Sequence, residues 1–276
     1  MRAVARPGRR GSGRWVWGLS GLVTAAVLGV PLAHLITGVG DPQNALPQNV
    51  VTRTETVAQP VTSLVVDSYG GQVQVASGPV SRVQVTETIM YDQHARTPAV
   101  MQSVSDGRLA LSSRACASAD CTVDFRMIVP PGVTATVSTG GGPVTVSGTA
   151  GTNVDSAGGS LLLRGVAGPL HADTGGGNLV GQDLAAPTAT ITTGGGDATV
   201  VFSAAPKSVK LSTDGGTAVL AVPGGPYAVT ADSGGGPESL GIATDPAARP
   251  TLTVSSGGGP LRIEPAPRLW RPGLSA

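Results

Sequence analysis

The feature that most constrains the fold is a pair of glycines that recurs at eight positions with the same flanking pattern; a further pair, Gly224-Gly225, belongs to a second, looser corner. From the second pair onward, the last glycines of successive pairs lie 17, 18, 19, 20, 20 and 23 residues apart. This slowly drifting period predicts a stack of short units, because one such unit cannot bury its apolar face alone. The pairs are Gly70-Gly71, Gly141-Gly142, Gly158-Gly159, Gly176-Gly177, Gly195-Gly196, Gly215-Gly216, Gly235-Gly236 and Gly258-Gly259.

The units share one residue pattern when they are aligned on the last glycine of each pair. An apolar residue stands five positions before that glycine in every unit, and an apolar residue stands four after it in all but one, where Gly181 replaces it. Alternation with a period of two is typical of half-buried strands. A hydroxyl residue stands three positions before the glycine in every unit: Ser68, Thr139, Ser156, Thr174, Thr193, Thr213, Ser233 and Ser256.

Each unit therefore reads as a strand, a glycine corner, a second strand and a looser second corner. Parallel stacking of such units at about 4.8 Å gives an all-β protein, a single-stranded β-solenoid of about seven to eight short rungs. We expect this fold because stacked side-chain ladders favour the same residue at the same place in every unit. The alternative is an antiparallel sandwich with a hairpin at each glycine pair.

The N-terminal region predicts a membrane anchor. Residues 15–39 form a run of 25 residues without a formal charge, long enough to span a bilayer as a helix. Five arginines precede this run, which places the N-terminus in the cytoplasm and the repeat domain outside the cell. A cleaved signal peptide is the alternative, and it too would export the repeats.

The expected domain organisation follows from these segments. Residues 1–14 form a basic cytoplasmic tail, residues 15–39 a single transmembrane signal-anchor helix, and residues 40–60 a linker. Residues 61–265 form the β-strand-repeat domain, in which residues 76–130 are an irregular cap that closes one end. Residues 266–276 form a C-terminal tail, where Trp270 is placed to cover the last rung.

The cysteines and the charge distribution narrow the possible partners. In an oxidising compartment, the closely spaced Cys116 and Cys121 predict a disulfide, while a metal site would need further ligands nearby. Residues 41–276 carry 13 basic and 17 acidic side chains, a net charge of −4. The main body therefore lacks the basic surface that nucleic-acid binding requires.

The glycine runs do not match phosphate-binding loops, and no enzyme is expected. A P-loop needs a lysine directly after its last glycine, and the only lysines are Lys207 and Lys210. A base for nucleophilic catalysis outside the predicted membrane helix could come only from His94 or His171. We therefore expect no catalytic residue and no cofactor.

Four aspartates at equivalent positions of the repeat give the most specific hypothesis about a ligand. Asp67, Asp155, Asp173 and Asp232 each stand four positions before the last corner glycine. In a solenoid, Asp155 and Asp173 would be neighbours on adjacent rungs, and a bound Ca²⁺ would relieve their repulsion. The alternative is that these carboxylates accept hydrogen bonds from backbone N–H groups at the corner.

Two longer stretches, "VVDSYGGQVQV" (residues 65–75) and "CASADCTVDFRMIVPPGV" (residues 116–133), stand before the regular repeats. With the basic N-terminus and the glycine corners, they resemble a bacterial envelope family described as putative adhesins or β-strand-repeat proteins of unknown function. The resemblance covers roughly residues 60–264. It implies a β-helix-like domain held outside the membrane, and it brings no catalytic residues.

The sequence thus predicts a membrane-anchored, non-catalytic, adhesin-like interaction module of the cell envelope. We expect the chain to cross the membrane once and to bind an unknown protein or a cell-wall glycan. No nucleic-acid partner is expected. The alternatives are an enzyme that acts on envelope polysaccharide and an accessory component of an envelope-stress sensing system.

Overall fold

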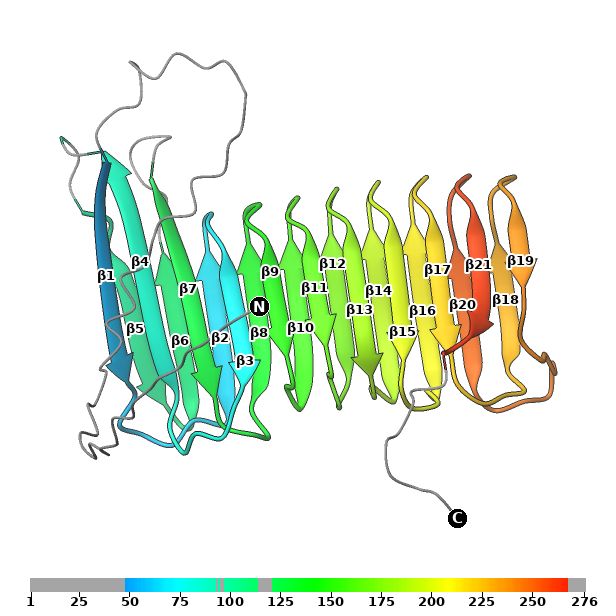
Figure 1. Ribbon diagram of the computed structural model, residues 1–276, viewed down its shortest axis with the longest axis horizontal. Helices are drawn as coiled ribbons and strands as arrows, with labels where there is room; N and C mark the ends of the chain where they lie inside the picture. Colours follow the sequence, from blue (N-terminus) through cyan, green and yellow to red (C-terminus); the bar gives the residue numbers. More distant parts are fainter. Residues whose placement is uncertain (1–47, 93, 95–96, 114–120, 268–276) are drawn as a thin grey trace, which may run out of the picture. The chain divides into compact units, whose positions relative to one another are not determined.

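The computed structural model describes residues 48–92, 94, 97–113 and 121–267, which belong to one compact unit, Leu46–Ala276. These residues form 21 strands in two sheets, so the predicted all-β class is confirmed (Figure 1). Within them there is no helix, and hence none long and apolar enough to cross a membrane. The span at residues 15–39 lies outside the described residues and stays a prediction.

The strands of each sheet follow one another in space from one end of the fold to the other. Sheet A, with 11 strands, consists in this order of β1 (Gln48–Thr56), β4 (Gln84–Asp92), β7 (Thr122–Val129), β3 (Val73–Ser77), β9 (Val144–Ser147), β11 (Leu161–Arg164), β13 (Leu179–Leu184), β15 (Ala198–Phe202), β17 (Ala218–Val222), β21 (Leu261–Pro265) and β19 (Glu238–Leu240). Sheet B, with 10 strands, consists from the same end of β5 (Val100–Ser105), β6 (Arg108–Ser113), β2 (Ser63–Ser68), β8 (Thr134–Thr139), β10 (Gly151–Ser156), β12 (Leu170–Thr174), β14 (Thr188–Thr193), β16 (Ser208–Thr213), β20 (Thr251–Ser255) and β18 (Ala228–Asp232).

The two strands of one repeat lie in different sheets. β8 pairs in parallel with β10 in sheet B, while β9 pairs in parallel with β11 in sheet A. The glycine corner therefore carries the chain from one sheet to the other and is not a hairpin within a sheet, so the antiparallel alternative is wrong. Both sheets are mixed, since the β1–β4, β4–β7 and β5–β6 pairs are antiparallel.

The inward side chains of neighbouring strands stack in register. Val137 of β8 is the register partner of Val154 in β10, which in turn partners Ala172 in β12, and all three are fully buried. Val144 and Val146 of β9 are buried on the opposite sheet, as their alternation predicts. The core between the sheets thus consists mainly of Val, Leu, Ile and Ala, with few aromatic side chains.

Spatial order departs from sequence order at both ends of the sheets. The first repeat, β2–β3, lies between β6–β7 and β8–β9, and β20–β21 lies between β16–β17 and β18–β19 (Figure 1). The end of the sheets is therefore formed by β18 and β19, and the chain leaves the fold from β21, one rung inside it. Trp270, expected over the last rung, lies outside the described residues.

The expected linker at residues 40–60 is wrong over residues 48–56, which form β1. The stretch alternates β-branched and polar residues, and it pairs along its whole length with β4. The prolines on either side, Pro47 and Pro60, are typical of a linker. The β-branched residues between them have the propensity of an ordinary β-strand. The expected cap at residues 76–130 contains β4 to β7, which lie at this same end of the sheets.

The one unit with an irregular second strand has a compensating bulge. Gly181 takes an inward position in β13, and a Cβ there would lie 2.9 Å from Leu184 Cδ1. The register between β13 and β15 shifts between these two residues, and Leu184 is fully buried. Leu184 thus fills the space that the missing side chain of Gly181 leaves. In the aligned sequence pattern, Gly181 is only an exception at an otherwise apolar position.

Close stacking explains the last glycine of each corner. A Cβ on Gly142, Gly177 or Gly196 would lie 1.7–2.2 Å from a glycine carbonyl oxygen of the neighbouring rung. Such a distance is impossible without moving the backbone, so only glycine fits. The preceding glycine differs, because a Cβ on Gly176 would meet nothing within 4 Å.

The hydroxyl residues of the corners form a buried internal ladder. Their hydroxyl groups bond backbone groups of the glycine corners. Thr174 Oγ1 donates to Gly159 O at 2.9 Å and accepts from Gly177 N at 3.1 Å. Thr213 Oγ1 donates to Gly216 O at 2.7 Å. All eight hydroxyl residues of the repeat are buried, which is possible because these bonds replace those to water.

The carboxyl group of Glu87 is directed into the core near β1. Glu87 lies in β4 between Val85 and Ile89, facing inward, and is 9% exposed. Burial raises the pKa of the Glu87 carboxyl above its ordinary value of 4.5; the nearby Glu55 raises it further, and Arg53 lowers it. Folding therefore favours the protonated carboxyl.

This raised pKa predicts a pH-dependent stability. The favourable contribution of protonated Glu87 is complete below its ordinary pKa and is lost as the pH rises through the folded-state pKa. We expect Glu87→Gln, which stays neutral, to be more stable than the wild type at about pH 7 and nearly equal to it at about pH 4. Denaturant unfolding of both chains across this range measures the difference, and a difference that does not change with pH would contradict the assignment.

Candidate functional site

The outer face of sheet B presents a continuous column of small polar and acidic side chains near the glycine corners. Its members are register partners from one strand to the next, so they follow each other directly across the sheet. From the β6 end to the β18 end they are Ser112, Asp67, Ser138, Asp155, Asp173, Thr192, Ser212, Ser255 and Asp232. We call this set the outer column.

Three of the four predicted aspartates come together in the outer column. Asp67, Asp155 and Asp173 line one shallow depression on the surface of sheet B, together with Ser138 and Tyr69. Asp155 and Asp173 are direct register partners between β10 and β12, as predicted. Tyr69, at the corner after β2, is 65% exposed and is the one large aromatic side chain here. Asp232 lies apart, on the edge strand β18.

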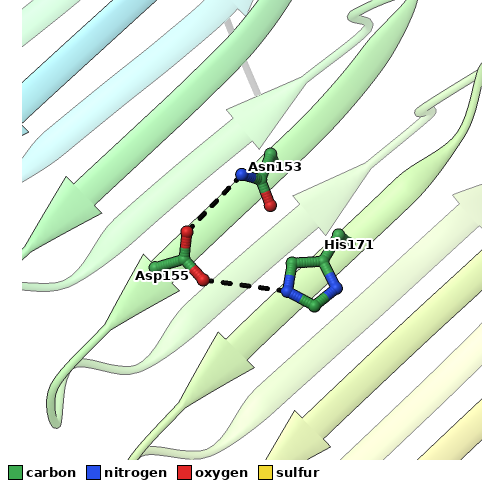
Figure 2. Close-up of polar contacts among 3 residues, drawn as sticks. All are labelled: Asn153, Asp155 and His171. Atoms are coloured by element: carbon green, nitrogen blue, oxygen red, sulfur yellow. Dashed lines mark hydrogen bonds and ion pairs between the residues drawn. The ribbon is translucent and has the colours of Figure 1, made fainter.

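Asp155, which lines this depression, belongs to a polar cluster with Asn153 and His171, drawn in Figure 2. His171 Nε2 lies 3.7 Å from Asp155 Oδ1, and Asn153 Nδ2 donates to Asp155 Oδ2 at 3.5 Å. Asn153 Oδ1 is buried and has no hydrogen-bond partner in the described part of the chain. The sequence pattern does not predict the pairing of His171 with Asp155, because the two meet diagonally across adjacent strands.

The pairing of His171 with Asp155 is an exposed contact. Their side chains are 47% and 51% exposed, so water screens the interaction and its contribution to stability is small. A catalytic histidine needs a nucleophile within hydrogen-bond reach. Among the described residues, the ring of His171 is hydrogen-bonded to no hydroxyl group. His94, the other possible base, lies in the loop after β4, where its backbone N–H donates to Asp92 Oδ1 at 2.6 Å.

The calcium hypothesis rests on Asp155 and Asp173. Across residues 48–92, 94, 97–113 and 121–267, no three His, Cys, Asp or Glu side chains are grouped so that they could hold a metal ion. Calcium usually takes six to eight oxygen ligands, so two neighbouring carboxylates would bind it weakly at most. The serine beside them, Ser138, would add only a hydroxyl oxygen.

We therefore expect millimolar Ca²⁺ to leave the thermal unfolding midpoint of the chain unchanged. A ligand that binds only the folded state raises the midpoint once its concentration exceeds the dissociation constant. Thermal unfolding with and without Ca²⁺ tests this expectation. A rise in the midpoint that is lost in Asp155→Asn/Asp173→Asn would contradict it and establish a calcium site at these two residues.

The predicted disulfide joins a described residue to one that is not described. Cys121 immediately precedes β7, whereas Cys116 lies outside the described residues. The bond between them stays a prediction.

Among known proteins, the comparisons find similar ones only among solved structures. No family model matches the chain, and no curated protein matches it. It is similar to a putative cell adhesion protein from Clostridium sporogenes, with 12% identity and a TM-score of 0.38 over 79% of this chain and 100% of that one. It is also similar to a putative adhesin from Parabacteroides distasonis, with 15% identity, a TM-score of 0.43, and 78% and 97% of the two chains covered. A putative adhesin from Bacteroides fragilis is similar with 14% identity, the same TM-score and the same coverage.

Proposed function

We propose that this chain is a membrane-anchored, extracytoplasmic β-solenoid that serves the bacterial cell envelope as a non-catalytic interaction module. The observation that carries the proposal is the outer column, in which Ser, Thr and Asp side chains repeat in register across nine strands of sheet B. A surface that repeats with the strand spacing suits a polymer better than a small substrate, which is usually held in a concave pocket.

The chemistry of the outer column favours a hydroxyl-rich polymer. Hydroxyl groups both donate and accept hydrogen bonds, and carboxylates accept them, so the column matches the hydroxyl groups of a glycan. Tyr69 adds one exposed ring at the depression where Asp67, Asp155 and Asp173 meet. We propose cell-wall glycan as the ligand of this face.

The membrane anchor is part of the same proposal. The uncharged span at residues 15–39 and the arginines before it support a single helix with the N-terminus in the cytoplasm. Labelling of single introduced cysteines in intact cells tests this topology. A residue introduced at position 5 should be protected from an impermeant thiol reagent, and one in the outer column should react.

Cosedimentation with purified cell-wall sacculi tests the binding function. We expect the full chain in detergent to bind, and Ser138→Arg in the outer column to weaken binding about tenfold, or about 1.4 kcal/mol. Thr145→Arg is the matched control, because Thr145 is equally half-buried but faces outward from sheet A. Absence of cosedimentation, or equal loss in both variants, would contradict the proposal.

The same experiment addresses the enzyme alternative. The three carboxylates of the depression are the observation that favours it, since glycan-cleaving enzymes use paired carboxylates. Soluble sugar released from the sacculi by the wild type, and not by Asp155→Asn/Asp173→Asn, would show catalysis and overturn the non-catalytic assignment.

A further inference from the structure

The two sheets do not end together on the β1 side. Counted outward from the rung β2–β3, sheet A continues through β7, β4 and β1, whereas sheet B continues only through β6 and β5. Sheet A therefore extends one strand further, and β1 is the outermost strand in Figure 1. In the described part of the chain, no strand of sheet B lies across from β1.

The inner face of β1 is consequently open. Arg53 is the register partner of the inward Glu87, and Glu55 is the partner of the inward Val85, so both belong to the inner face of β1. Both are nevertheless exposed. A side-chain hydrogen bond ties this face to sheet B: Gln102 Nε2 of β5 donates to Glu55 Oε1.

Among the described residues, no strand pairs with the outer edge of β5, which is an end of sheet B. β5 and β6 are joined by Asp106 and Gly107, whose φ angles of 50° and 74° are those of a two-residue hairpin turn. In such a hairpin the closing pair, Ser105 and Arg108, is hydrogen-bonded, and bonded pairs then alternate. The N–H groups of Val100, Gln102 and Val104 therefore point away from β6, toward the open edge.

This edge lacks the devices that usually block strand addition. Edge strands are commonly protected by charge, proline or short length. β1 carries Arg53 and Glu55, β18 ends on Asp232, and β19 has three residues. β5 has six residues and contains neither a charged residue nor a proline. Its Met101 is 48% exposed, and its Gln102, although it faces inward, is exposed as well.

The overhang of β1 limits what can pair with β5. If β5 paired with β5 of a second copy, the β4 strands of both copies would become neighbours in the other layer. No space would remain between them for the two β1 strands. The step formed by β5 and the inner face of β1 therefore admits one strand and excludes the edge of a second copy.

We propose that this step binds one extended polypeptide segment of another protein, which adds to sheet B as a strand beside β5. The segment would pair with the backbone groups of Val100, Gln102 and Val104, and β1 would cover its inner face. Side chains at alternate positions of the segment face the interior, and apolar ones suit the positions beside Val100 and Val104. Backbone pairing supplies affinity and the alternate side chains supply specificity.

This inference goes beyond the proposed glycan binding, because it concerns a different surface and a different class of ligand. A binding test with a peptide contains no glycan, so either proposal can fail without the other.

A labelled peptide tests the proposal directly. The probe is a fluorescein-labelled copy of residues 108–113, the sequence that already pairs with β5 from its other side and that places Leu109 and Leu111 at alternate positions. We expect saturable binding to the full chain in detergent by fluorescence anisotropy. Gln102→Pro, which removes the central outward N–H, should weaken binding at least about tenfold relative to Gln102→Ala, which keeps it.

The pair of variants separates backbone pairing from side-chain loss. Both variants lose the contact with Glu55, and neither disturbs a hydrogen bond between β5 and β6. We therefore expect equal thermal unfolding midpoints, which would show that both variants are folded. No binding to the wild type would overturn the proposal, as would equal binding by the two variants. Concentration-dependent dimers that Gln102→Pro abolishes would also overturn it, because they would show that a second copy occupies the edge.

Discussion

Gly177→Ala is expected to destabilise the fold by about 3 kcal/mol, the upper part of the range for overpacked sites. A Cβ at this position would lie 2.2 Å from Gly159 O and 2.5 Å from Gly159 C in the neighbouring rung. No side-chain rotation relieves such a contact, because both atoms belong to the backbone. The rungs must separate, and parallel hydrogen bonds on both sides of the corner weaken.

Gly176→Ala is the matched control for this variant. A Cβ there meets nothing within 4 Å, and the backbone does not need a positive φ. We expect a change of less than about 1 kcal/mol, in the stabilising direction, because alanine restricts the unfolded chain. Urea unfolding of both variants gives the comparison. Equal destabilisation by the two substitutions would refute the close stacking of the corners.

Thr174→Val is expected to cost about 2 kcal/mol, since it removes a buried hydroxyl that serves two backbone groups. Thr174 is fully buried, and its Oγ1 is bonded to Gly159 O and Gly177 N. Valine fills the same volume but forms neither bond, so the loss reports hydrogen bonding and not a cavity. The affected groups lie on two adjacent rungs, which is why the ladder stabilises stacking.

Thr190→Val provides the corresponding control. Thr190 lies on the outer side of β14 and is exposed. The substitution should change the free energy of unfolding by no more than about 0.5 kcal/mol. If the two valine variants were equally stable, the internal hydroxyl ladder would contribute nothing to the fold.

The regular part of the molecule could be predicted from the sequence because every unit has the same packing and hydrogen-bonding requirements. Each corner needs a glycine where two backbones approach and a hydroxyl where buried backbone groups need a partner. The alternation around Val137 and Val146 then fixes which side chains face inward. The adjacency of Asp155 and Asp173 followed from the same alignment.

The ends of the sheets could not be predicted in this way. The pattern within β2–β3 is compatible with any neighbour, so it does not reveal that β6–β7 lies outside it. β1 was missed because its pairing with β4 is set by distant contacts. The bulge that places Leu184 over Gly181 depends on the packing against β15, and the contact of His171 with Asp155 depends on the rotamers of two exposed side chains.

Deletion of one whole repeat is the most direct test of the stacked two-sheet architecture. Removing residues 160–177 takes out β11, β12 and one glycine corner, so that β10 and β14 become neighbours in sheet B and β9 and β13 in sheet A. We predict that this chain still folds and unfolds cooperatively in urea. Removing residues 160–168, which contain β11 alone, sends the following strands to the wrong sheet and should leave the chain unfolded. A whole-repeat deletion that is as damaging as the half-repeat deletion would contradict the stacked architecture.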